Sequence, residues 1–89
     1  MNELVYVLVR EDTNVDSGCF ETEVIGVYDS FDKAEESMVE EMRNARIDFA
    51  NDDFEEENYA QGDMSWSIWE KDGFSVNHTI IKIVAKEIN

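Results

Sequence analysis

The stretch that decides the fold is SFDKAEESMVEEMRNARIDFA, residues 30–50. Its apolar residues recur every three or four positions, which is the spacing of a helix that buries one face; they are Phe31, Ala34, Met38, Met42, Ala45 and Phe49. Ser30 is the predicted N-cap, and acidic residues follow it where the positive end of the helix dipole favours them. We predict a helix over residues 31–50, about 30 Å long and able to cross a sheet.

The residues before this helix predict two strands. Residues 4–11 (LVYVLVRE) are rich in β-branched side chains and place Val5, Val7 and Val9 on one face. Residues 20–28 (FETEVIGVY) also alternate, and Gly26 among them indicates a bulge or a close backbone approach. Residues 12–18 (DTNVDSG) have the composition of a loop, so the two strands are expected to form a hairpin.

The residues after the helix predict a second hairpin. Residues 64–71 (MSWSIWEK) and 79–88 (TIIKIVAKEI) flank Asp72-Gly73, a two-residue turn signal. The prediction is an α+β fold of order β-β-α-β-β, with a four-stranded, mainly antiparallel sheet and the helix on one face, forming a single domain over residues 1–89. How the hairpins pair stays open. Trp66, Ile68 and Trp69 form either a ligand-stacking face or part of the core or an interface, and we favour core or interface.

Charge excludes several classes of partner. The chain has 22 acidic and seven basic residues, a net charge of −15. Because phosphate binding needs a basic face and the basic residues are scattered, bare nucleic acid and anionic membranes are poor partners. The apolar run near the start covers only residues 4–9, and Cys19 is the single cysteine, so we expect a cytoplasmic protein without a disulfide or a zinc site.

The densest acidic stretch is DFANDDFEEENY, residues 48–59, in which three aromatic residues interleave with six carboxylates. Such a stretch is either a solvated loop or a surface that imitates nucleic acid and enters a basic groove of a protein. On the second interpretation the carboxylates attract the partner and the rings anchor it. The candidate binding residues are Asp48, Asp52, Asp53, Phe54, Glu55, Glu56, Glu57 and Tyr59.

Two further kinds of site have a partial signal in the sequence. Asp12, Asn14, Asp16 and Glu23 follow the spacing of a calcium loop, but Ser17 stands where that loop requires glycine and the flanks predict strands, so we expect no metal site and no cofactor. Cys19 and the only histidine, His78, would have to meet across distant loops to form a catalytic dyad. We therefore expect a protein that is not an enzyme.

A resemblance supports the topology. VYVLV at residues 5–9 and VIGVYDSFDKAEE at residues 24–36 resemble short, uncharacterised proteins of bacteria and their phages. In type, the chain is similar to small acidic phage anti-defence proteins, anti-CRISPR proteins among them. This implies an inhibitor or regulator that occludes a basic, nucleic-acid-binding surface of a protein. The alternative is an acidic mobile-element domain, homodimeric or metal-stabilised, without nucleic-acid mimicry.

Overall fold

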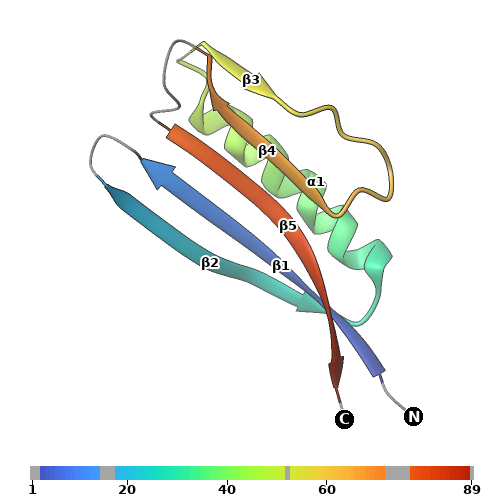
Figure 1. Cartoon of the computed structure of the whole chain (residues 1–89). Coiled ribbons are helices and arrows are strands. Elements are labelled where there is room, and N and C mark those ends of the chain that lie inside the picture. Colours follow the sequence, from blue (N-terminus) through green and yellow to red (C-terminus); the bar gives the residue numbers. More distant parts are fainter. Residues whose placement is uncertain (1–2, 15–17, 52, 72–76, 89) are drawn as a thin grey trace.

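The helix packs across one face of an antiparallel sheet, and no described helix or strand covers the other face (Figure 1). The computed structural model describes residues 3–14, 18–51, 53–71 and 77–88. The strand order is β2-β1-β5-β4-β3, and every neighbouring pair is antiparallel. The elements are β1 (Glu3–Asn14), β2 (Cys19–Tyr28), α1 (Phe31–Asp48), β3 (Phe54–Glu56), β4 (Ser65–Glu70) and β5 (Asn77–Ile88).

Helix α1 forms as its spacing predicts. The Ser30 side chain accepts a hydrogen bond from the backbone N–H of Lys33 at 3.3 Å, so Ser30 is the N-cap. The helix ends when the Phe49 N–H donates to the Ala45 carbonyl at 3.1 Å. Met38 and Met42 are buried in the middle of the inward face. The predicted packing of this face on the sheet is confirmed, with the helix two residues shorter at its C-terminal end.

The two hairpins join through their first and last strands. β1 pairs with β5 along its whole length, from Glu3 opposite Ile88 to Asn14 opposite Asn77. Figure 1 accordingly shows β1 and β5 side by side in the sheet. This is the pairing that the sequence left open, and it places β1 and β5 in the interior of the sheet.

A bulge interrupts the β1–β2 ladder where Gly26 indicated one. Leu8 lies opposite Gly26 and Val9 lies opposite Val24, so Ile25 is the extra residue on β2. A Cβ atom at Gly26 would lie 2.5 Å from the Tyr28 hydroxyl, which is the close approach that glycine permits. The bulge turns Ile25 toward the core, where it packs beside the helix.

The core lies between α1 and the three inner strands. Leu8 of β1, Trp66 and Ile68 of β4, and Ile81 of β5 are fully buried against the helix. The indole N–H of Trp66 donates to the Glu57 carbonyl at 3.0 Å, which satisfies the polar end of a buried ring. Trp66 and Ile68 are thus core residues, as we favoured.

The structure corrects two predictions. The sheet has five strands rather than four, because Phe54–Glu56 pairs with β4 as an edge strand inside the expected acidic connection. The expected loop over residues 12–18 is also too long, because β1 continues to Asn14 and β2 begins at Cys19. Long-range pairing with β5 holds residues 12–14 in the ladder despite their turn-like composition. The Asp72-Gly73 turn lies outside the described residues.

Candidate functional site

The predicted binding segment, residues 48–59, is tied to the rest of the fold. Its backbone pairs with β4, and the Glu57 N–H donates to the Ser67 carbonyl at 3.0 Å. The Asp53 carbonyl accepts from the Lys71 N–H at 2.8 Å. The segment is therefore an edge of the sheet with a connection, instead of a free acidic loop.

Three of its carboxylates already have internal partners. Asp48 accepts from Arg10 at 2.8 Å, and Glu57 accepts from the Ser67 hydroxyl at 2.5 Å. Glu56 accepts from both Nε and Nη2 of Arg46, each at 2.8 Å, and this pairing raises the pKa of Arg46. Arg46 also lies over the Trp66 ring, 5.2 Å from its centre. The carboxylate of Glu56 therefore anchors β3 to α1.

The aromatic residues of the segment turn inward. Phe54 packs edge-on against Phe49, with ring centres 6.2 Å apart, and Tyr59 packs on the same core. The rings therefore cap the core and do not project as anchors. Asp53 and Glu55 are exposed, whereas Asp52 lies outside the described residues.

A second row of carboxylates runs along the outward face of α1. Asp32, Glu36 and Glu40 are exposed and stand four residues apart, so they form one stripe. No ion pair involves any of the three within the described part of the chain. Like charges at this spacing destabilise a helix by about 0.2–0.5 kcal/mol per pair. The helix dipole offsets this repulsion at Asp32, in the first turn, so the unfavourable pair is mainly Glu36 and Glu40. The spacing of the stripe is itself readable in the sequence.

This stripe borders the segment that follows the helix. The Glu35 carboxylate accepts from the Tyr59 hydroxyl at 2.6 Å and from the Gly62 N–H at 2.7 Å. These two hydrogen bonds lower the pKa of Glu35. Burial, together with the hydrogen bond to Glu35, raises the pKa of Tyr59. A shallow groove of about 460 Å³ lies along this contact; it is lined by Asp32, Glu35, Glu36, Val39, Glu40, Arg43, Tyr59 and Gln61.

The helix and the residues on either side of it carry most of the charge. Thirteen of the 22 acidic residues and three of the seven basic residues lie between Asp29 and Asp63, which gives this part a net charge of −10. Two of the three basic residues, Lys33 and Arg46, are paired with carboxylates of the same part. The acidic surface is thus broader than residues 48–59 and includes the outer side of α1.

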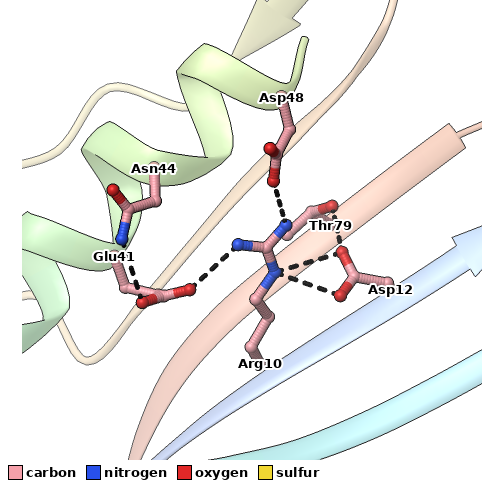
Figure 2. Close-up of polar contacts among 6 residues, drawn as sticks. All are labelled: Arg10, Asp12, Glu41, Asn44, Asp48 and Thr79. Carbon is pink, nitrogen blue, oxygen red and sulfur yellow. Dashed lines mark hydrogen bonds and ion pairs between the residues drawn. The ribbon is translucent and has the colours of Figure 1, made fainter.

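A buried arginine organises the far end of the helix (Figure 2). Nε of Arg10 donates to Asp12 at 3.0 Å, Nη1 to Glu41 at 2.9 Å and Nη2 to Asp48 at 2.8 Å. Burial alone would lower the pKa of Arg10, but the hydrogen bonds to these three carboxylates outweigh it and raise the pKa. Because each of its nitrogens is engaged by the protein, Arg10 joins β1 to α1 and is poorly placed to bind a ligand.

The remaining candidates lie around one cavity. This cavity of about 280 Å³ beside Arg10 includes Asp12, Asn14 and Glu21 in its lining, together with Cys19 and His78. Asp12 accepts hydrogen bonds from Arg10 and, at 2.6 Å, from Thr79, Glu23 lies across from Arg10 in the ladder, and Asp16 lies outside the described residues. Within the described ranges, no three acidic, histidine or cysteine side chains are grouped to hold a metal ion.

Cys19 and His78 both line this cavity, but their side chains belong to opposite faces of the sheet. Cys19 pairs with Asn14, and His78 pairs with the next residue of β1, Thr13. Because neighbouring strand residues point to opposite faces, the two side chains diverge. The His78 ring packs edge-on against Trp69, with centres 6.1 Å apart. The geometry thus gives no support to a dyad between them.

Fold and surface together define a small acidic α+β protein with one covered and one open sheet face. A family model described as a domain of unknown function, DUF7336, matches residues 3–64, and the chain belongs to this family. The match takes in β1, β2, α1 and β3. The searches of curated proteins and of solved structures gave no match. Among the described residues, no helix is long and apolar enough to cross a membrane.

Proposed function

We propose that this protein is a binding protein, an inhibitor or regulator that presents its acidic helix side to a basic, nucleic-acid-binding surface of another protein. The observation that carries the proposal is the unpaired stripe Asp32, Glu36 and Glu40 beside the acidic segment. Carboxylates that destabilise the free helix lose this cost when a cationic partner arrives. The same charges accelerate encounter with a basic groove.

Charge density sets the size of the binding surface. Residues four apart on a helix are separated by about 6 Å along the axis, whereas each strand of DNA carries one phosphate per about 3.4 Å. The stripe alone therefore has roughly half the density of a nucleic-acid strand. The proposed surface therefore continues around the edge strand β3 to the exposed carboxylates Asp53, Glu55 and Glu57. Glu55 lies opposite Trp69 and so points to the sheet face away from α1, and Glu57 keeps its hydrogen bond from Ser67.

The anchoring residues differ from those that the sequence suggested. Phe54 and Tyr59 are half-buried in the core. Val39 and Ile47 are the exposed large apolar side chains of α1, with 38% and 65% of their surface accessible. We assign to them the apolar contacts that give such an interface its affinity. Asp48 and Glu56 contribute through their ion pairs, by holding the surface in place.

The specific form of the proposal is a phage anti-defence protein, of which anti-CRISPR proteins are one kind. Small size, strong negative charge and a surface of carboxylates on a rigid helix suit a protein that competes with nucleic acid for a basic groove. Such a competitor needs no chemistry of its own, which agrees with the absence of a catalytic group in our interpretation of the sequence.

Capture of partners from a bacterial lysate, identified by mass spectrometry, tests this function. Two triple variants separate the two parts of the surface: Asp32→Asn/Glu36→Gln/Glu40→Gln on the helix, and Asp53→Asn/Glu55→Gln/Glu57→Gln on the segment. The variant Glu21→Gln/Glu23→Gln/Glu87→Gln removes the same charge from exposed positions of β2 and β5 and is the matched control.

Each surface variant should reduce capture at least tenfold and slow association, whereas the control should stay close to wild type. Raised salt should weaken the wild-type complex by screening. The captured protein should release a nucleic-acid probe when the wild-type chain is added. A partner that keeps its nucleic acid, or that binds both surface variants as tightly as the wild type, would contradict the proposal.

A further inference from the structure

The face of the sheet opposite α1 is rich in apolar residues, as a buried sheet face usually is. Alternation along β1 points Val5, Val7 and Val9 away from the helix, because Tyr6 and Leu8 between them pack toward it. An antiparallel sheet with one solvated face normally carries polar residues there. β1 instead has the apolar run of a strand that is covered on both sides.

The neighbouring strands extend this apolar surface. Val7 lies opposite Val27 of β2 on one side and Val84 of β5 on the other, so three valines form a row across the sheet. Val24 stands beside Val9 in the next row. Val24 and Val27 are 58% and 60% exposed, and Phe20 further along β2 is 62% exposed. Figure 1 shows no helix or strand of the described residues over this side of β2, β1 and β5.

The accessible surface area of the chain is larger than that of a typical monomer of the same mass. Its accessible area is 5969 Å², against about 5,400 Å² for a typical monomer of this mass. Its radius of gyration is 14.2 Å, against about 12 Å for a compact domain of this length. A two-layer arrangement with long strands and one bare face accounts for both differences.

We infer that this open face is the interface of a homodimer in which two sheets pack face to face. The charges on the open side of β2, β1 and β5 cancel: Glu3 and Glu11 balance Lys82 and Lys86, and Lys82 pairs with Glu11 at 2.9 Å. Glu55 lies on the same side but on β3, at the far edge of the sheet beyond β4. A second copy can therefore approach the β2, β1 and β5 part of this face without meeting net like charge, whereas the acidic helix side would repel another copy of itself. This self-complementarity favours a second copy over a partner of strong charge.

The available area suits a stable dimer. Three strands of ten to twelve residues, at about 3.3 Å per residue and 4.8 Å between strands, cover roughly 500 Å² before side-chain relief is added. Side-chain relief raises this flat area toward the roughly 800 Å² that each partner buries in a standard interface.

Charge does not oppose this arrangement. Sheets pack about 10 Å apart, and a helix lies 8–10 Å or so from what it packs against, so the two helices would lie about 30 Å apart on the outside. That distance is more than three Debye lengths at physiological salt. The dimer would display two acidic helix sides in opposite directions, which leaves the stripe Asp32, Glu36 and Glu40 free.

Sedimentation velocity between about 5 and 200 µM tests the inference. The wild type should show twice the 10.3 kDa mass of the chain. The dimer should persist in high salt, whereas high salt should weaken binding of the acidic helix side to its basic partner, so salt distinguishes the dimer from the proposed function. Val27→Lys and Val84→Lys should each raise the dimer dissociation constant at least 100-fold, because each dimer would then bury two lysine ammonium groups away from water. Ile47→Lys, at an equally exposed position on α1, is the matched control and should leave the mass unchanged.

Circular dichroism of each variant shows whether the monomer is folded. If Val84→Lys unfolds, the isosteric Val84→Thr should still weaken the dimer about tenfold while its spectrum is retained. A wild type that is monomeric at 200 µM would overturn the inference and leave the face to a different protein. A dimer that survives both Val27→Lys and Val84→Lys would overturn it as well, since the contact would then use another surface, such as the free edge of β2.

Discussion

Adjacent residues of β1 show how differently the two faces of this sheet are used. Leu8 is completely buried beneath α1, while Val7 points to the opposite face and is only partly covered. Both are apolar β-formers in the same strand, so composition does not distinguish them. The difference arises because the chain supplies a single helix, and that helix covers one face. Apolar character thus indicates where a surface is to be buried, and the fold decides whether the chain itself buries it.

The largest expected effect separates these two residues. Leu8→Ala should lower the free energy of unfolding by about 2–5 kcal/mol, because it leaves a cavity in a packed core. Val7→Ala should cost about 1 kcal/mol in the isolated chain, since its side chain is only partly buried there. Urea denaturation at low protein concentration measures both. Equal losses at the two positions would contradict the distinction between the faces.

The second comparison is between the stability contributed by the Arg10 ion pairs, on the sheet face that α1 covers, and by the Lys82 ion pair, on the open face. Arg10→Met leaves Asp12, Glu41 and Asp48 without their shared cation, and should cost about 1.5–3 kcal/mol, less than a fully buried pair because Asp48 is 60% exposed. Lys82→Met on the open face should cost at most about 1 kcal/mol. Thermal melts of both variants test this order.

Salt and a second substitution check the cause. Raised salt should recover part of the stability of Arg10→Met, because it screens repulsion among the three carboxylates. Adding Asp48→Asn to Arg10→Met should also recover part of it. If neither treatment has an effect, lost packing of the arginine stem, rather than charge, is the cause.

The smallest effect concerns pH and the contact between α1 and residues 59–62. The folded-state pKa of Glu35 lies below its ordinary value of 4.5, so its contribution to stability is present above about pH 4.5 and is lost as the pH falls through the folded-state pKa. Glu35→Gln should be less stable than the wild type at pH 7, and the difference should shrink below pH 4.5. The comparison of the two melting temperatures across pH isolates this residue from the other carboxylates.

The Tyr59 hydroxyl gives the complementary check at alkaline pH. Its folded-state pKa is raised above 10.0, so its contribution is present below about pH 10 and is lost as the pH rises through the folded-state pKa. Tyr59→Phe should show a small loss of stability at pH 7 that narrows as the wild-type tyrosine ionises. A difference that stays constant across both pH ranges would mean that the Glu35–Tyr59 hydrogen bond contributes no net stability.

The candidate site was only partly predictable, for reasons that individual residues make clear. The high density of acidic residues over residues 48–59 is visible in the sequence. The pairing of Glu56 with Arg46 depends on β3 lying beside α1, and no local sequence pattern predicts that contact. Phe54 and Tyr59 likewise turn inward because of tertiary packing. The stripe Asp32, Glu36 and Glu40 is a local helical spacing, so it was within reach of the sequence.

The sequence by itself determined the helix, its N-cap at Ser30, its buried face and four of the five strands, because each depends on periodicity and turn chemistry within about twenty residues. The tertiary structure alone decided that β1 pairs with β5, that Phe54–Glu56 forms an edge strand, and that one apolar face of the sheet stays open. These features join residues far apart in the chain. Their stability comes from hydrogen bonds and burial that exist only after the chain has closed on itself, so no local pattern carries them.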